Sequence, residues 1–486
     1  MRETGVLMPV FSLPSATGAG DLGKAAYRWV DLLAQSHVGI WQILPLNPVG
    51  YGNSPYQPYS SFAGDDLYIS LDRLYELGLI RKLPRTFMEH SARIDYSQVR
   101  AFREPYLREA FANFREDEDY QTFVRQSWVY LYGVFRALKA RNHNLCWNQW
   151  PDRDKNWPVS RKPLDEDIEK EAHYHMFLQY MFYIQWKALK TYANDKNIKI
   201  MGDIPFYVGI DSLDVWADRK SFLLDENGVP VFIAGVPPDY FSATGQRWGN
   251  PIYDWDYLKD HDYDFWIQRI GYNQKLFDII RIDHFRAFDT YWKIPATCPT
   301  AMEGEWIEAP GYEVLDMIFK KIPDVYLVAE DLGMLRPQVH TLKNHYHLKG
   351  MKILVFALDA SGKYARDIEA ESENMILYTG THDNDTIMEW YGKLTPASKR
   401  KIRRFLKSRN IKEGSIAQRL ITYVLRSQTD IAVISMPDAL ALGKEGHINT
   451  PGTVGSPNWE WHMADFKKAQ KQLFKLKHLI EENRQP

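Results

Sequence analysis

Cysteine is scarce in this sequence, and several other features are missing. The two cysteines, Cys146 and Cys298, lie far apart and supply neither a disulfide framework nor the repeated spacing of a zinc site. No apolar run approaches the ~20 residues that span a bilayer, and residues 1–12 lack the pattern of a signal peptide. A net charge of −2 gives no general attraction to nucleic acid or to an anionic membrane. We therefore expect a cytoplasmic protein that binds neither nucleic acid nor membranes.

Aromatic residues, in contrast, are abundant. They make up 14% of the chain, with 16 Trp and 29 Tyr among its 486 residues. Most of them are expected to pack in a large core. Those in loops are candidates for sugar platforms, because the C–H face of a pyranose ring is apolar. The basic segment Lys467 to Lys477 alternates with apolar residues, and we interpret it as the solvated face of a final amphipathic helix.

Short, nearly continuous apolar runs recur along the chain and predict strands that are buried on both faces. They cover residues 38–45, 198–207, 277–284, 325–331, 351–358, 375–383 and 431–437. Helical patterns separate most of them, for example at residues 25–36 and 401–426. This alternation predicts a parallel α/β fold.

Most of the predicted strands end in an acidic residue, and the set is Asp203, Asp283, Glu330, Asp359 and Asp383. In an α/β barrel the chemistry is built at that end of the strands. The run Gly18 to Gly23 has the spacing of a dinucleotide-binding loop, but no βαβ unit precedes it, so a nucleotide site there is not expected.

Two regions interrupt the alternation of strands and helices. Residues from about 71 to 172 are charged and helical in pattern, and residues from about 208 to 262 contain turn residues and aromatics. We interpret both as insertions on one barrel and not as separate domains.

Arg281 and Asp283 close one predicted strand. Because side chains two apart on a strand share a face, both are expected to point toward the barrel axis. The guanidinium should favour the ionised form of Asp283 and lower its pKa, as suits a nucleophile. A purely structural Arg–Asp pair is an equally good interpretation at this point.

Glu330 and Asp383 close two further strands. Partial burial should raise the pKa of Glu330, so that it could donate a proton to a leaving oxygen. Asp331 is the better candidate to cap the next helix. Asp383 and His382 could hold sugar hydroxyls, whereas Asp385 or Thr386 could cap the helix that follows.

Three acidic strand ends beside Arg281, His284 and His382 predict an active site, but they leave its chemistry open. The same residue types could bind a divalent metal. A retaining glycosidic site instead needs two carboxylates about 5–5.5 Å apart and aromatic walls. Loop residues of the required kind occur at Tyr51 to Gln57, at residues 237–251 and at 449–459.

The sequence resembles the amylomaltase family, the 4-α-glucanotransferases or disproportionating enzymes of the α-amylase clan. The resemblance covers nearly the whole chain. It is carried by GAGDLG, WQILPLNP, SPYQPYSSFAGDDLYISL, GDIPFYV, GVPPDYFSATGQRWGNP, RIDHFR, AEDLG, THDNDT and NTPGT. It implies a (β/α)₈ barrel with inserted subdomains and without a separate C-terminal β-domain.

By position in these motifs, the resemblance implies a retaining double displacement. Asp283 would be the nucleophile and Glu330 the general acid/base, while Asp383 would hold the reacting glucose. Further substrate-binding positions would be Arg281, His284, His382, Tyr51, Ser54, Tyr56, Asp203, Asp239, Tyr240, Phe241, Gln246, Trp248, Asp359 and Asn449.

The same resemblance implies the reaction and its partners. An α-1,4-glucan segment would pass to the 4-hydroxyl of glucose or of another α-glucan, without a metal or an organic cofactor. Tyr240 and Phe241 would sit on a mobile loop over the cleft.

Overall fold

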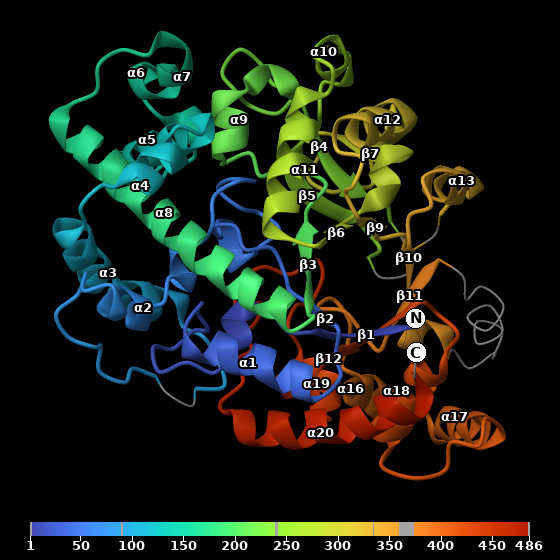
Figure 1. Ribbon diagram of the computed structural model, residues 1–486. Helices are drawn as coiled ribbons and strands as arrows, with labels where there is room; N and C mark the ends of the chain where they lie inside the picture. Colours follow the sequence, from blue (N-terminus) through green and yellow to red (C-terminus); the bar gives the residue numbers. More distant parts are fainter. Residues whose placement is uncertain (1, 89–90, 239–241, 334, 359–373, 485–486) are drawn as a thin grey trace.

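The computed structural model describes residues 2–484 apart from 89–90, 239–241, 334 and 359–373. Eight strands form one parallel sheet in the order β10-β11-β12-β1-β2-β3-β6-β9. Their bounds are β1 Glu3–Leu7, β2 Ile40–Gln42, β3 Lys199–Ile204, β6 Ile279–Ile282, β9 Leu327–Ala329, β10 Gly350–Ile353, β11 Met375–Tyr378 and β12 Ile431–Ser435. A parallel bridge between Val328 and Lys349 joins the two edge strands. The predicted (β/α)₈ barrel is confirmed (Figure 1).

Nineteen named α-helices surround and extend the barrel within the described residues. They are α1 Lys24–Gln35, α2 Leu71–Glu76, α3 Tyr96–Asn113, α4 Glu118–Val124, α5 Ser127–Arg141, α6 Asp152–Lys155, α7 Trp157–Ser160, α8 Glu166–Asp195, α9 Leu213–Ala217, α10 Trp255–Asp260, α11 Asp264–Leu276, α12 Gly311–Lys321, α13 Pro337–His345, α14 Leu354–Ala357, α16 Ile387–Lys393, α17 Pro396–Ser408, α18 Ile416–Arg426, α19 Met436–Ala439 and α20 Phe466–Asn483. None of them is both long enough and apolar enough to cross a membrane.

A second sheet, antiparallel and four-stranded, stands on the barrel in the order β5-β4-β7-β8. Its strands are β4 Phe232–Val236, β5 Gln246–Pro251, β7 Thr290–Pro295 and β8 Glu305–Glu308. β4 and β5 flank residues 237–245, whereas β7 and β8 follow barrel strand β6. The sheet therefore joins two connections that both leave the carboxyl ends of barrel strands.

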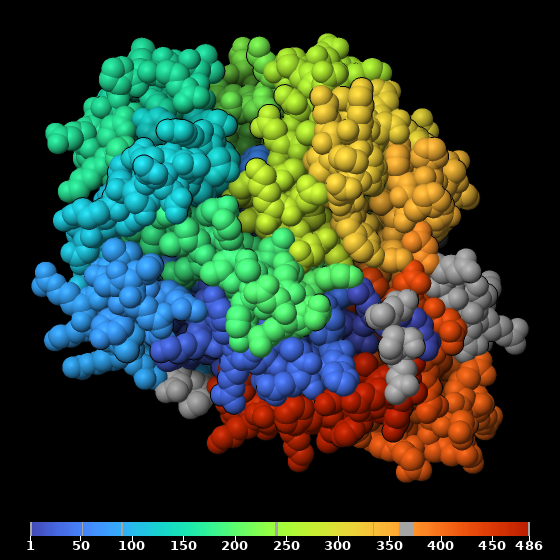
Figure 2. All heavy atoms as spheres, viewed as in Figure 1, coloured from blue at the N-terminus to red at the C-terminus, as the bar shows by residue number. Residues whose placement is uncertain are grey.

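The helical region between β2 and β3 lies on the other side of the molecule, from blue α2 to green α8 in Figure 1. α5 and α8 pack against each other, and α8 also packs against α1 and β3. Figure 2 shows the surface hollowed between the cyan and teal helices and the yellow-green elements around α11.

Two expected elements differ in extent. The apolar run at 351–358 contains β10 up to Ile353 and then turns into helix α14. The segment 401–426 is two helices, α17 and α18, because Asn410 and Gly414 take positive φ angles of 57° and 86° between them. Ser415 and Gln418 then form a capping box that starts α18.

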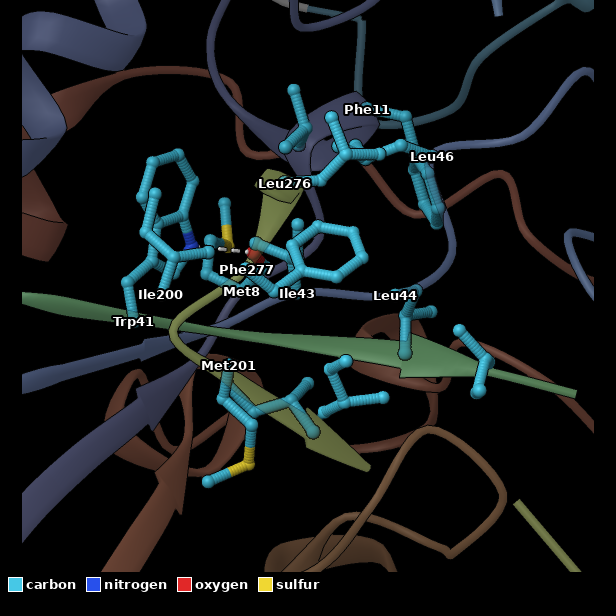
Figure 3. Close-up of a cluster of buried hydrophobic side chains, with 14 of the residues drawn as sticks. Met8, Phe11, Trp41, Ile43, Leu44, Leu46, Ile200, Met201, Leu276 and Phe277 are labelled. Carbon is cyan, nitrogen blue, oxygen red and sulfur yellow. Dashed lines mark hydrogen bonds between the residues drawn. The ribbon is translucent and has the colours of Figure 1, made fainter. Parts of the chain in front are cut away.

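Buried apolar and aromatic side chains fill the space between the barrel strands and their helices. In Figure 3, Met201 of β3 and Phe277 lie within this core, and Trp41 donates its indole N–H to the carbonyl of Met8 at 2.8 Å. A Cβ at Gly202 would lie 2.2 Å from the Phe277 ring, so only glycine allows this close approach beside Asp203.

The chain after β12 forms α19 and the predicted amphipathic helix α20. Along α20 the residues Phe466, Ala469, Leu473, Leu476 and Ile480 are buried, and the helix packs against α1 and α18. This end of the chain therefore closes the outside of the barrel.

Candidate active site

The carboxyl ends of β3, β6 and β9 bring three acidic residues together. Asp203 pairs in register with Arg281 of β6, and Asp283 follows directly on β6, where its backbone N–H donates to the carbonyl of Ile204 at 3.0 Å. Glu330 follows β9, which pairs with β6 on its other side. Neighbouring parallel strands thus deliver these side chains to one edge of the barrel, as the sequence predicts.

Arg281 is the cation at the centre of this edge. Its Nη1 donates to both oxygens of Asp203 at 2.7 Å, and its Nη2 lies 3.0 Å from Oδ1 of Asp283. The side chains of Arg281 and Asp203 are 4% and 1% exposed, whereas that of Asp283 is 28% exposed. Arg281 and Asp203 therefore lie beneath the site, and Asp283 reaches its surface.

Tyr56 and His382 extend this network sideways. The Tyr56 hydroxyl donates to Oδ2 of Asp203 at 2.8 Å and lies 3.3 Å from Nδ1 of His382. The two rings stack with their centroids 4.8 Å apart. Since Tyr56 uses its single proton on Asp203, the contact with His382 needs a proton on Nδ1 of the histidine.

Asp383 completes the network at the mouth of the barrel. Its Oδ2 lies 3.2 Å from Nε2 of His382, and its Oδ1 accepts from the Asn449 amide at 2.6 Å. Burial alone would raise the pKa of Asp383 and lower that of His382, but their mutual attraction reverses both shifts. The Asp383 side chain is 41% exposed, so a charged carboxylate reaches solvent at this end of the barrel.

Burial dominates the two remaining carboxylates. It raises the pKa of Asp283 to about 6, although Arg281 acts in the opposite direction. The lower pKa that the sequence predicts for Asp283 is therefore wrong, because desolvation outweighs the ion pair. Burial and the charge of Asp283 raise the pKa of Glu330 to about 7, which confirms the predicted direction.

Two backbone N–H groups hold the Glu330 carboxylate in place. That of His284 donates to Oε2 at 2.8 Å and that of Leu332 donates to Oε1 at 2.9 Å. His284 itself takes a positive φ of 54°, which turns the chain sharply after Asp283. This turn sets the position of Glu330 relative to the end of β6.

His284 and Trp248 form one wall of the site. Their rings meet edge to face with centroids 4.8 Å apart, and the Trp248 indole N–H donates to Oε1 of Gln246 at 3.2 Å. Burial lowers the pKa of His284 to about 3, so its imidazole is neutral. Its buried Nε2 has no hydrogen-bond partner among the described residues.

The loop after β2 carries Ser54, Tyr56 and the short helix that begins at Tyr51. Ser54 Oγ accepts from the backbone N–H of Tyr56 at 3.3 Å, which helps to place that ring. Of the other expected positions, Asp239, Tyr240, Phe241 and Asp359 lie outside the described residues.

Two neighbours lie in the candidate loops but are not among the predicted substrate-binding positions. Trp459 is 5% exposed and packs against Tyr56 and His382, with ring centroids 5.7 and 5.6 Å away, so its ring belongs to the packing around this network. Gln57 ties the loop to the antiparallel sheet by donating to Oδ1 of Asn250 at 2.8 Å. Gln57 ends the candidate loop segment Tyr51 to Gln57, and its position directly after Tyr56 is the signal that marks it.

The predicted helix caps have different outcomes. Thr386 caps α16 by accepting from the N–H of Glu389, as expected. Asp331 does not cap α13, whose N-cap is Arg336. Asp331 is instead buried, and its Oδ2 accepts from the Lys343 ammonium at 2.7 Å. Its Oδ1 accepts from the backbone N–H of Met351, so Asp331 secures β10 next to β9.

One group of side chains within the described residues has the spacing of metal ligands. It consists of Asp385, Glu389 and His447, and it lies next to the loop that carries Asp383. The Lys393 ammonium contacts both carboxylates of this group at 2.8 to 3.0 Å and neutralises part of their charge. Lys393 therefore already supplies a positive charge to these two carboxylates.

Comparison with known proteins places this geometry in a family. Residues 8–468 match the family described as 4-alpha-glucanotransferase. A 4-alpha-glucanotransferase of Thermus thermophilus is 40% identical over 476 residues, which cover 95% of each chain. One of Streptococcus pneumoniae is 38% identical over 475 residues, covering 96% of this chain and 94% of the relative.

The fold agrees with a solved structure of the same kind. The amylomaltase from Streptococcus agalactiae, solved in complex with acarbose, superimposes with a TM-score of 0.93 at 36% identity, and the match covers 100% of both chains. With the barrel, the acidic strand ends and these relatives in agreement, the chain belongs to the 4-alpha-glucanotransferase, or amylomaltase, family.

Proposed function

We propose that this chain is a 4-α-glucanotransferase that moves an α-1,4-glucan segment to the 4-hydroxyl of glucose or of another α-glucan. The observation that carries the proposal is the pair of carboxylates at the ends of β6 and β9. Glu330 has the higher pKa, about 7, and Asp283 the lower, about 6. Near neutral pH one can hold a proton while the other is charged, as a retaining mechanism requires.

In the first half-reaction Glu330 gives its proton to the glycosidic oxygen while Asp283 attacks the anomeric carbon. The bond between the anomeric carbon and the leaving oxygen breaks, and a β-linked glycosyl ester forms on Asp283. The reducing-end fragment leaves with the proton. Arg281, 3.0 Å from Asp283, favours the ionised nucleophile.

In the second half-reaction the ionised Glu330 takes the proton of a sugar 4-hydroxyl, whose oxygen attacks the ester carbon. The two inversions together retain the α configuration. Transfer prevails over hydrolysis only if a sugar competes with water for this step. We assign that selection to the loop between β4 and β5, with Tyr240 and Phe241 over the cleft.

The remaining positions bind the substrate in this proposal. Asp383 grips the hydroxyls of the reacting glucose, supported by His382 and Asn449. Asp203 acts from beneath through Arg281 and Tyr56, as its 1% exposure indicates. His284 offers its unpartnered Nε2. Donor and acceptor subsites are lined by Tyr51, Ser54, Tyr56, Asp239, Gln246, Trp248 and Asp359.

We also propose that residues 1–486 act as one catalytic unit. The insertions at about 71–172 and 208–262 then shape its cleft, and the second carries the active-site loop at 235–251. The acarbose bound by the similar amylomaltase from Streptococcus agalactiae is a glucan mimic and supports an α-glucan as the ligand class. Short maltooligosaccharides would be the simplest substrates.

Incubation with maltotriose alone tests the proposed reaction. A transferase yields glucose together with a ladder of longer oligosaccharides, which mass spectrometry or chromatography resolves. Products that are only shorter than maltotriose would indicate an α-glucan hydrolase and refute the transfer. Loss of activity on exhaustive EDTA treatment would instead favour a metal-dependent enzyme.

A further inference from the structure

An exposed tryptophan stands on the outermost strand of the antiparallel sheet. Trp306 lies on β8, and 40% of its surface is exposed. It pairs in register with Trp292 of β7, and the two rings meet at 61° with centroids 5.2 Å apart. A Cβ at Gly304 would lie 2.6 Å from the Trp292 ring, so the strand approaches this pair as closely as glycine permits. Trp306 is thus held at a fixed place.

Charged groups surround the exposed indole of Trp306. The Arg286 guanidinium lies over the ring, 4.0 Å from its centroid. On the same face of β8, Glu308 accepts from Arg336 at 3.2 Å, and Arg336 also pairs with Asp289. An aromatic face with hydrogen-bonding side chains at its rim is the combination that a sugar ring requires, because the ring has an apolar C–H face and polar edges.

Arg286 links this platform to the reaction centre. It follows Asp283 by three residues, on the short helix Phe285–Phe288 at the end of β6. Burial lowers the pKa of Arg286, while the nearby charges of Asp289 and Glu330 act to raise it. The backbone beside Arg286 is tied to Glu330, because the N–H of the preceding Phe285 donates to the carbonyl of Glu330 at 3.2 Å, and the Arg286 guanidinium lies 4.0 Å from the centroid of the Trp306 ring. The path from the reaction centre outward runs from Glu330 through Arg286 to Trp306.

We propose that Trp306 is an outer subsite for the acceptor, binding an α-glucan unit beyond the sugar that reacts. This inference rests on the proposed function, in which Glu330 serves the leaving and entering 4-oxygens. The side of the cleft reached past Glu330 is then the acceptor side. The occupant is one glucose ring of a longer chain, packed against the part of the indole that Arg286 leaves exposed, with its hydroxyls at Glu308 and Arg336. Glucose itself is too short to reach it.

The test measures acceptor use as a function of chain length. α-Maltosyl fluoride serves as donor, because its leaving group contains no sugar, and glucose, maltose, maltotriose and maltohexaose serve as acceptors. Trp306→Ala should leave kcat/KM for glucose within about twofold of the unaltered enzyme. It should lower kcat/KM for the longer acceptors by about three- to tenfold, chiefly through KM. Trp306→Phe should retain part of the increase in kcat/KM that the unaltered enzyme shows as the acceptor becomes longer.

Two further variants separate binding from folding. Trp306→Leu keeps an apolar contact with Trp292 without a flat ring and should lose the length dependence as Trp306→Ala does. Phe474→Ala removes an aromatic residue of similar exposure, 38%, on α20, which Figure 1 places at the opposite end of the molecule from β4 and β7. It should leave the acceptor profile unchanged.

Each outcome decides a distinct question. An equal fall with glucose and with maltohexaose would mean that Trp306 only supports Arg286, and no change at any length would mean that it does not bind the acceptor. Either result overturns the outer subsite. If the unaltered enzyme transfers to none of the four acceptors, the proposed function fails instead.

Discussion

The floor of the site and the antiparallel sheet above it are built in different ways. On the floor, Asp203 and Arg281 are nearly inaccessible, and each charge has a partner at 3.0 Å or less. On the sheet, β8 exposes Glu305, Trp306 and Glu308. Buried, fully paired groups keep one geometry, whereas exposed residues of a connecting segment can vary.

This difference divides the reaction between two regions. Cleaving a glycosidic bond depends on fixed charges in a poorly solvated place, and the floor provides them. The choice between water and a sugar, and between short and long acceptors, depends on surfaces that meet the entering molecule. We therefore expect variants of the floor to change the rate of every reaction. Variants of the sheet should change only the ratio of hydrolysis to transfer and the preference for short or long acceptors.

The largest effect is expected from Asp283→Asn. Without a nucleophile no glycosyl ester can form, so kcat for maltotriose disproportionation should fall by about 10⁴-fold or more. The amide is nearly isosteric, so the melting temperature should not drop. Activity within about tenfold of the unaltered enzyme would refute the role of Asp283 and would make the floor no different from the sheet.

Glu330→Gln should lower kcat for maltotriose by about 10²- to 10⁴-fold. With α-maltosyl fluoride, whose leaving group needs no proton, the first half-reaction should continue and the ester on Asp283 should accumulate, as intact-protein mass spectrometry would reveal. Failure to form any ester from the fluoride would contradict the assignment of Glu330 as acid and base.

The pH dependence of kcat/KM follows from the pKa values of Asp283 and Glu330. In the unaltered enzyme kcat/KM should rise through about 6 as Asp283 ionises and should fall through about 7 as Glu330 loses its proton. In the unaltered enzyme this alkaline fall should be present with maltotriose and absent with α-maltosyl fluoride, because fluoride leaves without a proton from Glu330. A fall that persists would belong to another group.

Tyr56→Phe tests whether the hydrogen bonds of the floor matter beyond its charges. Loss of the hydroxyl leaves Asp203 and His382 without one partner each, and kcat should fall by about tenfold. Tyr192→Phe is the matched control, since Tyr192 makes a similar bond of 2.7 Å to Asp31 away from the site. Equal activity of both variants would show that the charges alone suffice.

The smallest effect on rate is expected from a variant of the loop between β4 and β5. Tyr240→Ala should change the total rate of maltotriose consumption by less than about threefold, while the ratio of hydrolysis to transfer rises. The measurement compares released reducing ends with the yield of longer oligosaccharides. An unchanged ratio would count against water exclusion by this loop.

The sequence predicts most strands of the barrel, because their signal is local. A strand buried on both faces must be apolar along its length, and the polar residue that ends it must face the cleft. β1, with Thr4 and Gly5 in its short length, lacks that signal. The sequence does not predict strands β7 and β8 either, since Lys293, Trp306 and the acidic residues of β8 give no clean alternation.

The acidic residues of the site can be recognised in the sequence, but the pKa shift of Asp283 cannot be predicted from it. Arg281 next to Asp283 predicted a lowered pKa, because an ion pair can be recognised from neighbours in the chain. The opposing effect, burial, depends on strands and loops far away in sequence, and it raised the pKa to about 6 instead. Long-range packing also explains why Asp331 pairs with Lys343 and does not cap a helix.

The sequence by itself determined the parallel α/β barrel, the three acidic strand ends and the family, because these depend on periodicity and on contiguous motifs. Only the tertiary structure decided that Asp203, Tyr56, His382 and Asp383 form one network, and that Trp306 lies beyond Arg286 on an exposed edge. Such contacts join residues that are up to several hundred positions apart, and their geometry is fixed by how strands and helices pack, which no local pattern records.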